Sequence, residues 1–174
     1  LAFPTYKWAL GPYGFACLYA APHRQDGTAI EAHVGNVPPA VGARRYDRGE
    51  LNDPVVLAMA AAALAPVAGW NTASVAVRLR ALTDRLAAEA EAPGFAAAPR
   101  HLRAPHLLGL RRPGGLPPGL ADVLIGKRVF FSERSGALHL SPHVWVADAD
   151  IGRCTAAPRD ALGGTARDWT DTAA

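Results

Sequence analysis

Near its start the chain reads YKWALGPYG at residues 6–14 and FACLYAAP at residues 15–22. Lys7 is one of two lysines in a chain whose other cationic side chains are arginines. Guanidinium stays protonated in proteins, whereas a lysine amine can lose its proton and attack a carbonyl. Lys7 also lies between Tyr6 and Trp8, a setting expected to be desolvated and to favour the neutral amine. A structural or surface lysine is the alternative, and the residue taken alone favours it.

The next segments predict a strand, a loop and a helix. Residues 14–21 are an apolar run bounded by glycine and proline, which predicts a buried strand. Residues 22–49 are irregular in sequence and predict a long loop, a kind of segment that often carries function. Asp53 followed by Pro54 and then VVLAMAAAALA predicts the start of a buried helix, because the aspartate can cap its free N–H groups.

A second helix is expected to begin at Asn71 or Thr72 and to end before Pro93. Its apolar residues recur with the helical period, and they are Val75, Leu79, Leu82 and Leu86. Residues 95–105 are rich in alanine and proline and predict a linker.

A small α/β layer is expected after the linker. Its predicted elements are strands over 106–110 and 129–132, a short helix over 118–126, a strand over 137–140 that pairs back across a turn at 134–136, and a helix from 148. The tail from residue 156 is weak helix material and is expected to be poorly ordered.

Composition excludes several classes of protein. Half of the 174 residues are apolar and 19% are charged, which excludes wholesale disorder. The net charge of +3 is too small for a dedicated nucleic-acid binder. The longest apolar run, residues 55–70, is shorter than a membrane span. Two distant cysteines suggest neither a disulfide framework nor a zinc site, so a cytoplasmic protein without membrane or nucleic-acid partners is expected.

Three motifs occur in an order that resembles one enzyme family. They are the segment at 6–14 followed by its strand, RYDRGE at residues 45–50, and SPH at 141–143 with ADADI at 147–151. In this order they resemble class V aminotransferase-like enzymes, the fold-type I pyridoxal phosphate (PLP) group that includes cysteine desulfurases, kynureninases and isopenicillin-epimerase-like proteins. The similarity runs from about residue 1 to about residue 154 and corresponds to the C-terminal part of such an enzyme.

The resemblance implies roles for particular residues. Lys7 would hold PLP through a Schiff base and would then act as the acid/base that moves the substrate α-proton, with Tyr6 beside it at the cofactor. Gly49 and Glu50 would lie near the PLP phosphate of the neighbouring subunit in a homodimer. Two departures weaken the phosphate contacts: relatives often have a hydroxyl residue at the position of Pro4, and desulfurase-like members have threonine at the position of Glu50, whose ionised carboxylate cannot donate a hydrogen bond.

His139 falls where relatives carry the arginine that grips the substrate α-carboxylate. Imidazole cannot form the bidentate pair that guanidinium forms. Three explanations stay open: the substrate lacks the usual carboxylate contact, Arg134 or another residue supplies it, or the site has decayed.

Desulfuration is disfavoured because that chemistry needs a cysteine on the loop before the substrate arginine, and residues 113–138 contain none. Cys17 and Cys154 are better explained as small apolar side chains in the core. The histidine pairs at 101 and 106 and at 139 and 143 are separated by proline, so no metal site is expected.

The sequence therefore predicts an α/β fold, the C-terminal part of a fold-type I PLP-dependent transferase. Residues 1–92 would be the end of the large domain with connecting helices, residues 93–155 a small α/β domain, and residues 156–174 a tail. The expected activity is PLP-dependent amino-group chemistry, by transamination, epimerisation or elimination, on a small amine or amino acid, and a chain that lacks the front half is expected to be inactive alone. The alternative is a non-catalytic binding or dimerisation module derived from that fold.

Overall fold

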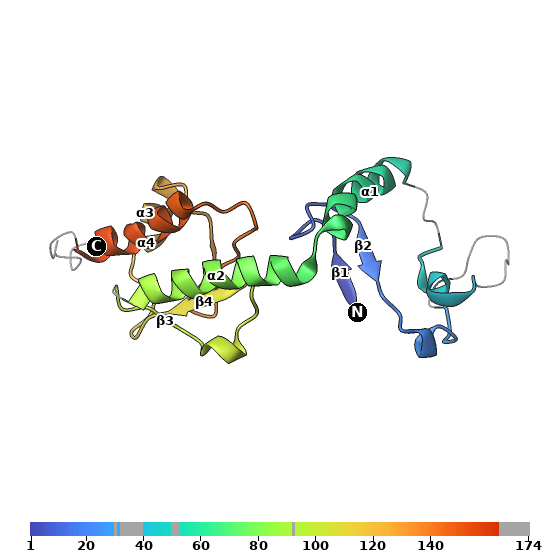
Figure 1. Cartoon of the computed structure of the whole chain (residues 1–174), viewed down its shortest axis with the longest axis horizontal. Coiled ribbons are helices and arrows are strands. Elements are labelled where there is room, and N and C mark those ends of the chain that lie inside the picture. The colour runs from blue at the N-terminus through green and yellow to red at the C-terminus, as the bar shows by residue number, and fades with distance from the viewer. Residues whose placement is uncertain (30, 32–39, 50–52, 92, 164–174) are drawn as a thin grey trace, which may run out of the picture. The chain divides into compact units, whose positions relative to one another are not determined.

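The computed structural model describes residues 1–29, 31, 40–49, 53–91 and 93–163. Contacts divide the chain into two compact units, Leu1–Trp70 and Asn71–Ala174 (Figure 1). The boundary predicted from the sequence lies later, between residues 92 and 93. The structure differs because the helix at Thr72–Glu91 buries its apolar face in the second unit.

The first unit begins with a two-stranded antiparallel hairpin. Strand β1 (Ala2–Pro4) pairs with β2 (Ala16–Leu18), and the two 3-10 helices η1 (Pro22–Arg24) and η2 (Gly42–Tyr46) follow. The predicted strand over 14–21 is therefore shorter than expected. Its side chains are exposed or half-buried, so the prediction that the strand is buried is wrong for this structure.

Helix α1 (Pro54–Gly69) begins where the sequence predicts. The Asp53 side chain caps it by accepting hydrogen bonds from the backbone N–H groups of Val55, at 3.1 Å, and Val56, at 2.9 Å. Ala60 is the one buried residue that the structure describes in this helix, and Val55 is 65% exposed. The predicted helix is thus confirmed, whereas its predicted burial is not.

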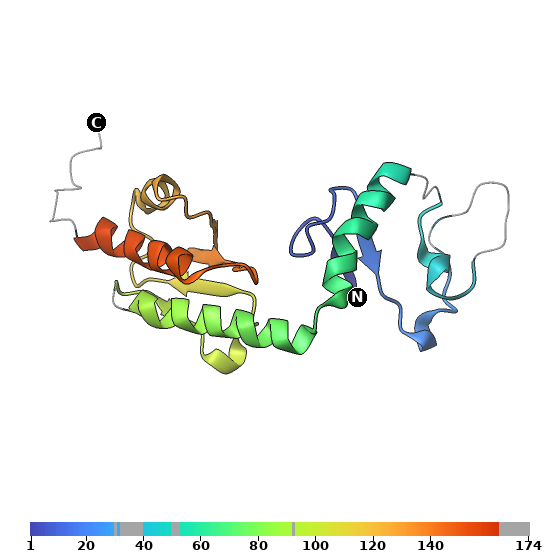
Figure 2. The same cartoon turned by 45° about the horizontal axis from the view of Figure 1, so that its top comes forward.

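The second unit is a four-stranded antiparallel sheet with helices packed on one face (Figure 2). The strand order is β3-β4-β6-β5. The strands are β3 (Ala96–Ala97), β4 (Leu108–Arg111), β5 (Ser132–Arg134) and β6 (Ala137–Leu140). The helices are α2 (Thr72–Glu91), α3 (Leu120–Gly126) and α4 (Asp148–Gly163). Leucines on alternate positions of β4 and β6 are buried on the helix-covered face: Leu108, Leu110, Leu138 and Leu140.

Helices α2 and α4 run side by side, as both views show (Figures 1 and 2). Arg85 of α2 donates to Asp148 at the start of α4, at 2.8 Å. Thr155 of α4 donates at 2.7 Å to Glu89, which lies one turn after Arg85 on α2. These bonds, together with buried Leu86 and Ile151, join the two helices over the sheet.

Three predictions for this unit need correction. Residues 95–105 are not a plain linker, because they include β3 (Ala96–Ala97), which pairs with the end of β4, and η3 (Arg100–Leu102). The strand predicted over 129–132 begins only at Ser132, since the N–H of Val129 caps α3 by donating to the carbonyl of Leu124 at 2.9 Å. Residues 156–163 are helical, because α4 continues through Pro158 with Ala157 fully buried.

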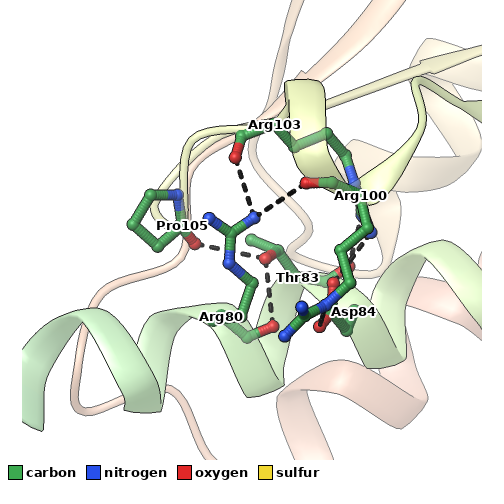
Figure 3. A network of polar contacts seen from close by, with 6 residues as sticks. All are labelled: Arg80, Thr83, Asp84, Arg100, Arg103 and Pro105. Carbon is green, nitrogen blue, oxygen red and sulfur yellow. Dashed lines mark hydrogen bonds and ion pairs between the residues drawn. The ribbon is translucent and has the colours of Figure 1, made fainter.

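A polar network ties α2 to the segment around η3 (Figure 3). Asp84 accepts hydrogen bonds from Arg100 at 2.8 Å and from Arg103 at 2.7 Å. Arg80, one turn earlier on α2, donates to the backbone carbonyl of Arg103 at 2.8 Å. The network fixes the path of the chain between α2 and β4.

No single helix among the described residues is long and apolar enough to cross a membrane, and only α1 and α2 counted together, with a bend between them, reach that length and composition.

Candidate functional site

The loop that carries Lys7 is closed by hydrogen bonds at the base of the β1–β2 hairpin. Thr5 is fully buried, and both its backbone N–H, at 3.1 Å, and its hydroxyl, at 3.0 Å, donate to the carbonyl of Phe15. The N–H of Gly11 donates back to the carbonyl of Thr5 at 2.8 Å. A Cβ at Gly11 would lie 2.6 Å from the Cβ of Thr5, which is closer than real atoms approach. Glycine is therefore required there, and the loop is held at its base.

Lys7 lies at the exposed end of this closed loop. Its Nζ is 5.7 Å from the ring centroid of Tyr6, and Tyr6 stacks on Tyr13 with centroids 4.4 Å apart. The desolvated setting expected from the aromatic neighbours is not present, because Lys7 is exposed although its Nζ lies over the ring of Tyr6. The amine is accessible to a carbonyl compound.

The segment that contains Gly49 belongs to the same unit. Arg45 donates to the carbonyl of Gly27 at 2.9 Å, and the N–H of Gly27 donates to the Tyr46 hydroxyl at 3.0 Å. The N–H of Gly49 donates to a carboxylate oxygen of Glu31 at 2.7 Å. This amide is therefore occupied by a carboxylate of the chain itself, and a phosphate could accept its N–H only after displacing Glu31. Glu50 lies outside the described residues.

The structure brings His139 and Arg134 to one face of the sheet. In the β5–β6 pair His139 lies opposite Ser132, and Arg134 lies opposite Ala137. Directly opposed side chains share a face, and diagonal neighbours remain within reach of long side chains. The hydroxyl of Ser132 lies 3.2 Å from Nδ1 of His139. On β4, Gly109 lies opposite His139, and a Cβ there would have no neighbour within 4 Å.

The two groups of predicted residues lie in different units: Tyr6, Lys7 and Gly49 in the first, Arg134 and His139 in the second. Within the first unit, no hydrogen bond or ion pair between described residues joins Lys7 to Gly49. The resemblance does not require such a contact, because it assigns Gly49 to the cofactor of a neighbouring subunit.

Cys154 does not have the properties of a nucleophile. Cys154 is half-buried on α4, and burial raises the pKa of its thiol to about 11. At neutral pH this thiol is protonated and unreactive. Cys17 is half-buried on β2.

Among the residues that the structure describes, no group of three or more histidine, cysteine, aspartate or glutamate side chains could hold a metal ion.

Two residues at these sites, Thr5 and Ser132, are not predicted from the sequence. Thr5 braces the lysine loop, and Ser132 contacts His139. A hydroxyl residue two positions before Lys7 is a signal that could have found Thr5. No local signal identifies Ser132, because its place opposite His139 depends on strand register.

Comparison with known proteins gives a likeness of fold. No protein-family model matches the sequence, and no curated protein does. A solved structure described as a "NifS-like protein" is similar with a TM-score of 0.71 and 18% sequence identity. The match covers 94% of this chain and 46% of that one, so the chain spans less than half the length of this neighbour.

This likeness shows the fold. The chain has the mixed α/β fold of a part of a NifS-like protein, and the predicted fold class, a part of a larger α/β enzyme fold, is confirmed.

Proposed function

We propose that this chain is part of a PLP-dependent enzyme that performs amino-group chemistry on a small amine or amino acid, with Lys7 as the Schiff-base lysine. The observation that carries the proposal is the exposed amine of Lys7 on a loop closed by Thr5 and Gly11. The likeness of fold to a NifS-like protein supports it.

The residues of the first unit fit the cofactor in one respect, because Lys7 is an exposed residue on a braced loop. The N–H of Gly49 donates to a carboxylate oxygen of Glu31, so a phosphate would have to displace that carboxylate to bind there. When bound, PLP supplies the electron sink for chemistry at the substrate α-carbon. Lys7 would hold the cofactor and then take or return the proton at that carbon. Gly49 would donate to the phosphate across a homodimer interface.

The sheet face of the second unit that carries His139 offers the groups that the resemblance assigns to the substrate. Arg134 is exposed, lies on the same face as His139, and can form the bidentate carboxylate pair that imidazole cannot. His139, with Ser132 at Nδ1, would add a hydrogen-bonding group to the same substrate. Arg134 is therefore the residue that we assign to the substrate carboxylate.

Transamination, epimerisation and elimination all begin with the proton transfer assigned to Lys7. Desulfuration is disfavoured because residues 113–138 contain no cysteine and the Cys154 thiol is protonated at neutral pH. The choice among the first three depends on substrate contacts on the sheet face.

An absorbance titration tests the proposal. PLP is added to the chain and to the variants Lys7→Arg and Lys127→Arg, and the visible band of a lysine-bound cofactor is recorded. The band should appear with the parent and with Lys127→Arg but not with Lys7→Arg. Equal bands in all three proteins, or none in any, would favour a non-catalytic binding module.

A further inference from the structure

A cavity of about 310 Å³ opens in the second unit between β6, α4 and the loop after α3. Its walls are apolar, because Leu86, Val129, Leu140 and Ile151 all line it. Leu140 is on the helix-covered face of the sheet, whereas His139 and Arg134 lie on the other face. The cavity is therefore separate from the substrate site proposed above, and its volume is in the range of small-molecule sites.

Two of the aromatic side chains that line the cavity are largely exposed to solvent. Phe130 is 81% exposed and Trp145 is 60% exposed, and both line the cavity. Trp145 stacks on the buried ring of His143 with centroids 3.6 Å apart, which fixes its position. Large exposed aromatics beside a cavity are typical of a surface that binds a ligand.

Among the charged side chains that line the cavity, one cation has no ion pair with a described residue and could pair with an anionic ligand. Asp150 pairs with Arg153 through one carboxylate oxygen and accepts the N–H of Ala147 at 2.9 Å through the other. The hydroxyl of Ser141 is directed to the carbonyl of His106 at 3.2 Å. Arg128 also lines the cavity, is exposed, and has no ion pair with any described residue.

The backbone of Arg128 is in a conformation that favours glycine. Its φ of 58° is left-handed, and it ends α3 with its N–H donating to the carbonyl of Ile125 at 2.8 Å. Glycine is the usual residue at such a helix end because a side chain is strained there. Arg128→Gly would therefore remove the backbone strain together with the guanidinium.

We propose that this cavity binds a small aromatic monocarboxylate. The aromatic ring of the ligand would lie between the apolar walls and the exposed aromatic side chains, and its carboxylate would pair with the guanidinium of Arg128. The other polar side chains that line the cavity, Ser141, Asp150 and Arg153, already have polar partners, so the ligand is expected to carry one anionic end only. Arg128 can grip that end through two parallel N–H groups.

Binding of 3-phenylpropionate to the full chain tests this assignment, with 3-phenyl-1-propanol and acetate as comparison probes. Isothermal calorimetry gives the affinity, and the indole N–H signal of Trp145 in NMR spectra gives the place of binding. The aromatic acid should bind at least tenfold more tightly than either comparison probe and should shift the Trp145 signal.

Two variants separate ligand contact from folding. Arg128→Gly removes the guanidinium and relieves the backbone strain, so it should fold at least as well as the parent and bind 3-phenylpropionate at least tenfold more weakly. Ser135→Gly relieves similar backbone strain in the β5–β6 turn, where residue 135 has a left-handed φ of 50°. This variant should leave binding of 3-phenylpropionate unchanged. Any of three results would overturn the proposal. The parent does not reach saturation at millimolar 3-phenylpropionate, or it binds 3-phenylpropionate and 3-phenyl-1-propanol equally tightly, or Arg128→Gly binds 3-phenylpropionate as tightly as the parent does.

Discussion

Asp84 is the acceptor at the centre of the network between α2 and η3 (Figure 3). The hydrogen bond from Arg100, together with the positive charges of Arg100, Arg103 and Arg80, lowers the pKa of Asp84 from its ordinary value. Because the folded-state pKa is the lower one, the ionised carboxylate stabilises the fold at pH above the ordinary aspartate value, about 4. This stabilisation is lost as the pH falls through the folded-state pKa.

Asp84→Asn is expected to lower the free energy of unfolding by about 1 kcal/mol at neutral pH, since the pair is partly exposed. Urea unfolding at pH 7 and at about pH 3 measures the effect, and the gap between variant and parent should shrink at the acid pH. Glu91→Gln, an exposed position on the same helix, is the matched control. An equal gap at both pH values would show that the carboxylate charge contributes nothing.

Some residue roles were readable from the sequence and others were not. Asp53 was predicted to cap α1 because a cap depends only on its immediate neighbours in the chain. The desolvated setting predicted for Lys7 is wrong, because neighbours in sequence do not reveal whether aromatic rings will cover the amine. The pairing of His139 with Ser132 depends on strand register, which the residue pattern alone leaves open.

At the scale of elements, the cap of α1 gives a direct test. Asp53→Ala removes the acceptor for two backbone N–H groups and should destabilise the helix by about 1 kcal/mol. Circular dichroism during thermal unfolding measures the loss. Asp53→Ser keeps a side-chain acceptor and should retain most of the stability. If Asp53→Ala and Asp53→Ser lose the same stability, the hydrogen bonds of the cap do not stabilise the start of α1.

The register of β4 gives a second test. Leu108 is fully buried, whereas its neighbour Leu107 is 38% exposed. Leu108→Ala should lower the free energy of unfolding by about 2–4 kcal/mol, because it leaves a cavity against the helices. Leu107→Ala is the matched control and should cost below about 1 kcal/mol. Chemical denaturation compares the two, and similar losses would contradict the observed register.

Element boundaries were less predictable than the elements themselves. The turn between β5 and β6 was predicted from Ser135-Gly136, and both residues have positive φ as such a hairpin turn requires. Strand β3 was not predicted, because Ala96–Ala97 has little strand propensity and owes its pairing to β4. The continuation of α4 past Pro158 was missed since burial of Ala157 outweighs the local proline signal.

At the scale of the whole molecule, the described core is unevenly divided between the two units. Among the described residues, every buried apolar side chain except Ala60 belongs to the second unit. Both units expose large apolar side chains, and those of the first unit include Leu1, Tyr13 and Val41. Burial of apolar surface is the main source of folding free energy, so the two units differ in their capacity to fold alone.

A fragment of residues 71–174 is therefore expected to fold independently, with a cooperative thermal transition close to the one that the second unit shows in the whole chain. Residues 1–70 alone should give no cooperative transition. Calorimetry of both fragments and of the chain makes the comparison. A fragment of residues 71–174 that stays unfolded would show that its core depends on the first unit.

The central claim is that Lys7 is the lysine that binds PLP, and reductive trapping tests it most directly. The Lys7 amine condenses with the PLP aldehyde with loss of water, and borohydride then delivers hydride to the carbon of the C=N bond while the nitrogen gains a proton. Peptide mapping by mass spectrometry distinguishes Lys7 from Lys127, the other lysine of the chain. The account predicts that the pyridoxyl group is found on Lys7 in large excess. Equal labelling of the two lysines, or labelling of Lys127 alone, would contradict it.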